Sequence, residues 1–119
     1  MFSIEHPDQT FEELEQNLHV AVELLKSLSN ERRLLIVCAL CIKERSVGEL
    51  EEIVELSQSA LSQHLARLRR DGLVETRRKA QTIYYSLKDE RAHMVLECLM
   101  HIFCPDRIKN AGIKSFREL

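Results

Sequence analysis

The chain has 119 residues and a formal net charge of −2, with 17 Lys and Arg against 19 Asp and Glu. This length predicts one domain with a modest core, and such a core gains from sharing an interface with a second copy. Because no run reaches the roughly 18 uninterrupted apolar residues of a membrane helix and the start lacks the cationic region of a signal peptide, we expect a cytoplasmic protein without membrane contact.

The charges are distributed unevenly along the chain. Residues 1–56 hold 5 Lys and Arg against 12 Asp and Glu, residues 57–88 hold 7 against 2, and residues 89–119 hold 5 of each. Phosphate contact needs local positive charge and not a basic protein overall, so the basic middle third is compatible with binding to duplex DNA. A solvated charged surface is the alternative interpretation.

Residues 11–28 carry apolar residues at alternating steps of three and four, which predicts one helix with a heptad stripe. The stripe is too short for an independent coiled coil, so it indicates a helix packed either in the core or against a partner subunit. The stripe consists of Phe11, Leu14, Leu18, Ala21, Leu25 and Leu28.

Two further helices are predicted before residue 57. Ser29 and Asn30 offer an N-cap for an almost continuous apolar run over 34–42, which is typical of a buried central helix. Ser46 followed by Glu49 matches a capping box and predicts a short amphipathic helix.

The next predicted helix begins after an N-cap at Ser57 and ends at Gly72. Three leucines at steps of four and three define its buried side, and its other faces carry side chains that can hydrogen-bond with base edges. His64 could equally be a partly buried helix residue. The base-reading candidates are Gln58, Ser59, Ser62, Gln63 and His64.

After Gly72 the apolar period changes to two, over 73–77 and again over 82–87, which predicts a β-hairpin with a basic tip. Cationic and polar side chains on the hairpin and at the end of the preceding helix are candidates for phosphate or minor-groove contact. These candidates are Arg67, Arg70, Arg77, Arg78, Lys79, Gln81 and Thr82.

A last helix is predicted from about Asp89 to Cys104, where Pro105 stops it. The elements together predict a mainly α protein with a small β-hairpin wing: a winged helix-turn-helix of four helices, a hairpin and a fifth helix. We expect a homodimer formed through the terminal helices and bound to double-stranded operator DNA. The predicted divisions are an N-terminal arm (1–10), the DNA-binding and dimerisation domain (11–104) and a C-terminal tail (105–119).

Several segments resemble one known family. The run Ser-Gln-Ser-Ala-Leu-Ser-Gln-His-Leu at 57–65, followed by Leu68 and by Gly-Leu-Val at 72–74, resembles the recognition segment of ArsR-type repressors. The segments 30–34, 46–50 and 81–85 extend the resemblance and are most similar to the HlyU and BigR subgroup. The resemblance implies a winged-helix transcriptional regulator that is not an enzyme and needs no cofactor.

The resemblance also implies roles for two cysteines. Members of that subgroup carry one cysteine in the second helix and one near the end of the last helix, and these respond to persulfides or oxidants. Cys38 and Cys104 match the two positions. The resemblance therefore implies that reactive sulfur or an oxidant joins Cys38 to Cys104 and lowers DNA affinity, and reversible thiol chemistry of this kind is well founded.

Other interpretations of the cysteines remain open. Cys41 and Cys98 do not match the subgroup pattern, so they are core residues or alternative resolving thiols. Cys38 and Cys41 also form a C-x-x-C pair, as in thiol-disulfide oxidoreductases, but this pair lies in a mid-helix apolar run without the strand and helix N-terminus of such enzymes. Cys98 and Cys104 are six residues apart, which argues against a four-cysteine zinc site.

Two alternative functions complete the hypotheses. A metal-sensing repressor is the first, because three possible ligands share one helix face at steps of four, although such a row more often marks a solvated helix side. We predict no metal ligands in this chain. A constitutive DNA-binding protein without an effector is the second alternative. The three residues of the row are His93, Glu97 and His101.

Overall fold

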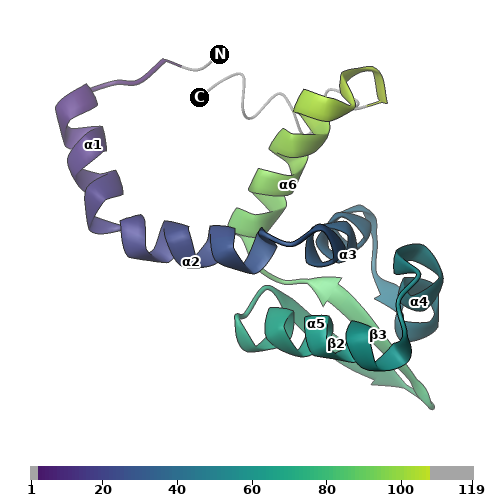
Figure 1. Ribbon diagram of the computed structural model, residues 1–119. Helices are drawn as coiled ribbons and strands as arrows, with labels where there is room; N and C mark the ends of the chain where they lie inside the picture. Colours follow the sequence, from purple (N-terminus) through teal and green to yellow (C-terminus); the bar gives the residue numbers. More distant parts are fainter. Residues whose placement is uncertain (1–2, 108–119) are drawn as a thin grey trace.

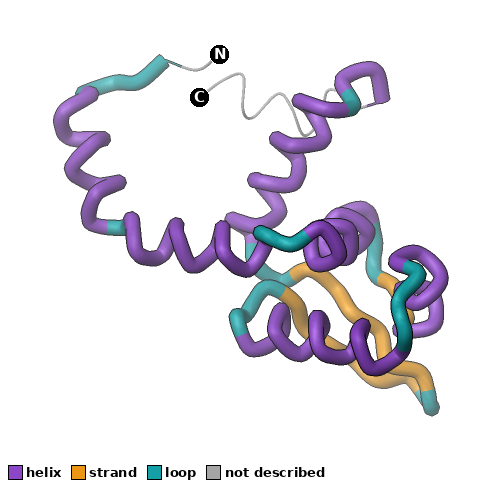
Figure 2. The backbone as a smooth tube through the Cα atoms, viewed as in Figure 1, coloured by secondary structure: helices purple, strands orange, loops and turns teal. Residues whose placement is uncertain are grey.

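The computed structural model describes residues 3–107. Figure 1 shows α3 in the middle of the molecule, with α4, α5 and the β-hairpin on one side of it and α2 and α1 extending away on the other. The strands form one small sheet among the helices (Figure 2). The elements are α1 (Pro7–Gln16), α2 (Leu18–Leu28), α3 (Glu31–Ile42), β1 (Arg45–Ser46), α4 (Val47–Val54), α5 (Gln58–Arg70), β2 (Val74–Lys79), β3 (Thr82–Leu87), α6 (Glu90–Phe103) and a 3-10 turn, η1 (Pro105–Arg107).

The hydrophobic core surrounds α3, which packs against α2, α4, α5, α6 and β3. Ile36 and Val37 of α3 have no exposed surface. Burying side chains of this size stabilises the fold by roughly 1.5–3 kcal/mol each. The predicted buried side of α5 is confirmed, since Leu61, Leu65 and Leu68 are at most 3% exposed.

Local capping signals define where the central helices begin. The Asn30 side chain accepts hydrogen bonds from the backbone N–H groups of Arg32 and Arg33, at 3.0 and 3.1 Å. The capping box at the start of α4 is confirmed, because Ser46 and Glu49 exchange two backbone-to-side-chain hydrogen bonds of 3.1 Å. These bonds use backbone N–H groups that the first turn of a helix leaves without partners.

The predicted hairpin is confirmed, and a short additional strand joins it. β2 and β3 pair antiparallel around a two-residue turn, in which Ala80 has a positive φ of 56°. β1 pairs with β3 through Arg45 opposite Tyr85, so the sheet has the order β1-β3-β2. Two residues are too few to show an alternating pattern, which explains why this strand was not predicted.

The single helix expected over 11–28 is wrong. Asn17 separates α1 from α2, with φ −108° and ψ 7°. Its side-chain amide donates to the carbonyl of Glu13 at 2.8 Å, and its backbone N–H donates to the carbonyl of Leu14 at 2.9 Å. An asparagine side chain that bonds nearby backbone groups competes with helical hydrogen bonds, and here it ends the first helix.

Helix α1 begins at Pro7, within the predicted N-terminal arm (1–10). Pro7 occupies the first turn of this helix, where its missing N–H costs nothing. Residues 7–10 are therefore compatible with the helix, and the structure places them in it. None of the residues of α1 is buried. Most of the predicted tail, residues 108–119, lies outside the described residues.

Gly72 ends α5 as predicted. Its φ of +78° belongs to the left-handed region that glycine adopts without strain. The backbone N–H of Gly72 bonds the carbonyl of Arg69 and that of Leu73 bonds the carbonyl of Leu68, which is a Schellman motif. The chain therefore turns sharply from α5 into β2. Within the described residues, no helix has the length and apolar character needed to cross a membrane.

Candidate DNA-binding surface and thiol pair

Helix α5 presents a polar outer face because its leucines hold the opposite face in the core. Its first turn is fixed by Ser57, whose hydroxyl accepts a 3.2 Å hydrogen bond from the N–H of Ala60. Four of the five predicted base-reading residues are exposed on this helix. These four are Gln58, Ser59, Ser62 and Gln63.

His64 lies differently from the other four candidates. It is half-buried, whereas the other four are exposed. Burial lowers the pKa of His64, and the nearby positive charge of Arg33 lowers it further. The imidazole is therefore held in its neutral form more strongly than an ordinary histidine.

The end of α5 carries three arginines, of which the sequence analysis selected two. Arg69, which it did not select, lines a surface hollow of about 430 Å³ together with Ser62, Arg70 and Tyr85. Its position between two selected arginines was the available signal. Arg67 is less free than its neighbours, since its Nε lies 3.5 Å from Asp71 Oδ2.

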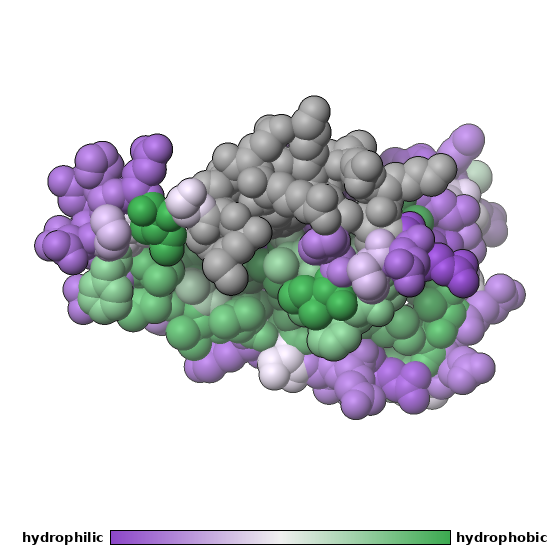
Figure 3. Space-filling model, turned by 90° about the horizontal axis from the view of Figure 1, so that it is seen from above, coloured by the Kyte–Doolittle hydropathy of each residue, from purple (hydrophilic) through white to green (hydrophobic). Residues whose placement is uncertain are grey.

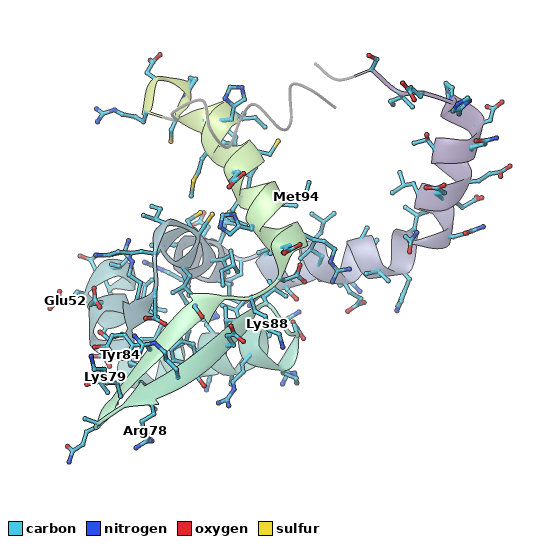
Figure 4. The ribbon with its side chains drawn as sticks, turned by 180° about the vertical axis from the view of Figure 1, so that it is seen from behind. Glu52, Arg78, Lys79, Tyr84, Lys88 and Met94 are labelled. Carbon is cyan, nitrogen blue, oxygen red and sulfur yellow. The ribbon has the colours of Figure 1, made fainter. Side chains whose placement is uncertain are left out.

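The exposed cations of the wing lie near the tip of the hairpin. Figure 4 shows Arg78 and Lys79 toward the tip of the hairpin, with Tyr84 on the adjoining strand. Both cations are exposed. Gln81 and Thr82 line a second hollow, of about 460 Å³, beside Ser46 at the start of α4. The structure thus brings the wing tip close to the first helix of the helix-turn-helix.

Arg77 is already engaged within the protein. Its Nε and Nη2 donate to the two carboxylate oxygens of Glu44 at 2.8 and 2.6 Å, and its guanidinium lies 4.6 Å from the centre of the Tyr84 ring. The hydrogen bond lowers the pKa of Glu44 and raises that of Arg77. Glu44 is a residue of this surface that the sequence analysis missed, because its partner is 33 residues away.

The two predicted switch cysteines lie on helices that pack together. Cys38 is half-buried in α3, Cys104 is exposed immediately after α6, and the two helices are in contact. Burial raises the pKa of the Cys38 thiol, and the negative charge of Cys104 raises it further. The contact between α3 and α6 thus links the helix that contains Cys38 to the helix that ends immediately before Cys104.

Cys41 belongs to a separate polar group between the same helices. Its Sγ lies 3.6 Å from His93 Nδ1, and that nitrogen lies 3.1 Å from Glu97 Oε1. Burial, with the charges of Glu97 and Cys38, raises the pKa of Cys41 to about 11. In the part of the chain that the structure describes, no set of three or more His, Cys, Asp and Glu side chains is arranged to hold a metal ion.

Comparison with known proteins agrees with the winged-helix geometry. The family described as "Bacterial regulatory protein, arsR family" matches residues 30–76. The transcriptional activator HlyU of Vibrio cholerae is 55% identical over 93 residues, covering 78% of this chain and 86% of that protein. This chain belongs to the ArsR family.

Solved structures support the assignment of this ArsR-family protein. Reduced HlyU from Vibrio cholerae superposes with a TM-score of 0.74 and covers 78% of this chain and 98% of that one. The transcriptional repressor BigR from Xylella fastidiosa, 43% identical, gives a TM-score of 0.75 over 78% of this chain and 95% of that one. The predicted subgroup is therefore confirmed.

The comparisons also decide the general activity of this ArsR-family protein. Its relatives are named as transcriptional regulators, among them the Escherichia coli regulator YgaV, which is 44% identical over 78% of this chain and 95% of its own length. The protein is a transcriptional regulator and not an enzyme, and its helix-turn-helix implies DNA binding.

Proposed function

We propose that this ArsR-family regulator binds operator DNA as a homodimer and that reversible sulfur chemistry at Cys38 and Cys104 switches its affinity. The observation that supports the switch is the packing of α3, which contains Cys38, on α6, which ends immediately before Cys104. The DNA-binding part rests on the exposed polar face of α5 beside the cationic wing.

In this proposal α5 enters the major groove, which is about 12 Å wide and admits one helix. The amides of Gln58 and Gln63 suit bidentate pairing with adenine, and the hydroxyls of Ser59 and Ser62 can pair with more than one base. Arg78 and Lys79 contact phosphates or the minor groove from the wing, together with Arg70, Gln81 and Thr82. Such contacts give affinity that falls as salt rises.

The proposed dimer face is an uncovered apolar surface on α2 and α6. The face contains a groove of about 430 Å³ between α2, α3 and α6, lined by residues such as Val22, Leu25 and Leu99. Leu25 is 56% exposed, and Phe103 near the end of α6 is 77% exposed. Figure 3 shows hydrophobic residues extending across this view of the molecule. An apolar surface of this extent marks an interaction site, and a second copy offers the same surface in return.

Two valines on α2 allow a matched test of the dimer. Val22 is 44% exposed and lines the groove, whereas Val20 is 43% exposed and lies outside it, two residues away on the helix. Val22→Glu should produce monomers in analytical ultracentrifugation, because it places a charge in the interface. Val20→Glu should leave the dimer intact. Equal behaviour of the two variants would exclude this face as the interface.

The sulfur chemistry begins at the exposed thiol. The Cys104 thiolate attacks the sulfane sulfur of a persulfide RSSH, giving a Cys104 persulfide and a free thiolate RS⁻. The Cys38 thiolate then attacks the inner sulfur of that persulfide and releases HS⁻, which leaves a Cys38–Cys104 disulfide. The persulfide RSSH is the two-electron oxidant in this sequence of steps. A dithiol reductant restores both thiols. A solved relative described as reduced HlyU is consistent with thiols that change state in this subgroup.

A disulfide between Cys38 and Cys104 can change the DNA-binding surface through a shift of α3. Drawing Cys38 toward Cys104 changes how α3 packs on α6, and the chain that leaves α3 carries Glu44, which holds Arg77 of the wing. A shift of α3 would therefore move a wing cation as well as the core that supports α5. We expect the oxidised dimer to bind DNA more weakly.

Fluorescence anisotropy on DNA from upstream of the protein's own gene tests the switch. The reduced protein is titrated, treated with an organic tetrasulfide, titrated again, and titrated once more after re-reduction. Affinity should fall at least about tenfold and then recover, because ligand-linked changes between two states are commonly of this size. Cys38→Ser and Cys104→Ser should abolish the response.

Cys98→Ser is the matched control, because it removes a half-buried thiol of α6 that the proposal does not use. This variant should respond like the wild type. Tight binding that is indifferent to tetrasulfide would favour constitutive DNA binding, and a response to Zn²⁺ in place of sulfur would favour metal sensing. Either outcome would overturn the sulfur switch.

A further inference from the structure

Two polar side chains lie in the interior where α2, α3 and α5 meet. Ser27 is 3% exposed and Arg33 is 8% exposed. Arg33 Nε donates to the backbone carbonyl of Ser27 at 2.8 Å, and its Nη2 donates to that of Lys26 at 3.3 Å. Both carbonyls belong to the last turn of α2, where helical donors run out. Arg33 therefore fixes the end of α2 on α3.

The Ser27 side chain continues this connection to α5. Its hydroxyl donates to Asp71 Oδ2 at 2.5 Å, across 44 residues of sequence. Asp71 is the C-cap residue of α5, and the same oxygen lies 3.5 Å from Arg67 Nε. A short hydrogen bond from a hydroxyl to a carboxylate is charge-assisted and is stronger than one between neutral groups.

The helix itself gives no reason for an aspartate at this position. A negative charge at the C-terminus of a helix opposes the helix dipole, so Asp71 is unfavourable for α5 taken alone. The side chain is instead satisfied by Ser27 and Arg67. α2 packs on α1 and α3, and the hydrogen bond from Ser27 connects it with the C-cap residue of α5. A local conflict that tertiary contacts compensate often marks a functional position.

We infer that Ser27 and Arg33 are positioning residues for DNA recognition, which fix the angle between α2 and α5. The inference rests on the proposed function, in which α2 carries the dimer face and α5 carries the base-reading residues. In a dimer with two-fold symmetry this angle sets the distance between the two α5 helices, and that distance must match the spacing of the two half-sites. The corner thus makes the protein selective for one half-site spacing.

The test compares duplexes that differ only in the spacing of their two half-sites. The wild-type protein selects a duplex from a random pool, and the same duplex is then made with one and with two base pairs inserted at the centre of its inverted repeat. Affinities for the three duplexes are measured by fluorescence anisotropy for wild type, Ser27→Ala, Ser27→Thr and Asp71→Asn. The readout is the ratio of affinities between the selected duplex and those with insertions.

Ser27→Ala should lower this ratio by about tenfold, because it removes one hydrogen bond to a charged group. Ser27→Thr keeps the hydroxyl and should keep the ratio, and Asp71→Asn should fall between them. A general loss of folded protein lowers the affinity for every duplex by the same factor, so it leaves the ratio unchanged. The ratio therefore separates positioning from stability.

An unchanged ratio in Ser27→Ala, with or without an equal fall in affinity for all three duplexes, would overturn the inference. Failure of the proposed function is visible separately, in the wild type alone. If the wild type selects no duplex, or selects isolated half-sites without an inverted repeat, dimeric DNA binding fails whatever the variants do.

Discussion

Arg77 of β2 and Glu44, which follows α3, form a two-pronged ion pair with hydrogen bonds of 2.8 and 2.6 Å. The pair joins the helix that carries Cys38 to the wing. It also neutralises a cation that the sequence analysis assigned to DNA contact, so a phosphate must compete with Glu44 for Arg77.

Removal of Glu44 should therefore strengthen DNA binding. In Glu44→Ala the freed guanidinium can neutralise a phosphate, and the slope of log affinity against log salt should steepen by about 0.9 per dimer half-site. Anisotropy titrations at several salt concentrations measure this slope. Glu52→Ala is the control, since it removes an exposed carboxylate of α4 without releasing Arg77. Identical slopes for the two variants would contradict the competition.

His64 should make the stability depend on pH. Its pKa is lowered in the folded protein by burial and by Arg33, so the unfolded chain binds the proton more readily. Its contribution to the free energy of unfolding is complete above the ordinary pKa of 6.5 and is lost as the pH falls below that value. His64→Gln should lose less stability than wild type between about pH 7.5 and about pH 5.5, as measured by urea unfolding. His19→Gln, on the exposed surface of α2, should behave like wild type, and an undiminished loss in His64→Gln would disprove this account.

The thiols should react in a definite order. Cys104 is exposed, whereas the pKa of Cys41 is raised to about 11 by burial and by the charges of Glu97 and Cys38. The thiolate fraction of Cys41 at neutral pH is therefore about a hundredfold below that of a thiol with the ordinary pKa of 9.0. Timed alkylation with iodoacetamide, read by mass spectrometry, should modify Cys104 first and Cys41 last. Early labelling of Cys41 would contradict this order and would show that the contact between α3 and α6 opens in solution.

Asn30→Ala should destabilise the protein by about 1 kcal/mol, because the N-cap of α3 would lose its bonds to Arg32 and Arg33. Urea unfolding at neutral pH measures the change. Asn17→Ala provides a comparison at another exposed asparagine, whose side chain makes no N-cap hydrogen bond to α2, so the cost should stay within about 0.5 kcal/mol. An equal loss in the free energy of unfolding at both sites would mean that the N-cap hydrogen bonds of Asn30 add no stability to α3.

Local signals in the sequence were sufficient for most of the fold. The capping box of Ser46 and Glu49 and the left-handed Gly72 involve residues close together in the chain, so their patterns are visible without a structure. The helix break at Asn17 was not visible in the sequence, because the apolar stripe continues across it. The exposed positions of Gln58 and its neighbours follow from helical periodicity, but contacts between distant segments do not. The Arg77 pair with Glu44 and the burial of Ser27 depend on how the helices pack, which no local pattern contains.

Helix α1 buries none of its ten residues within its own chain. An isolated helix of this length is marginal in water, since the cost of nucleation is not recovered in so few turns. Its helicity then depends on whatever covers the exposed Phe11 and Leu14. If a second copy does so, the helix content of the protein should fall on dilution, and circular dichroism at decreasing concentration would report assembly through the folding of its first helix.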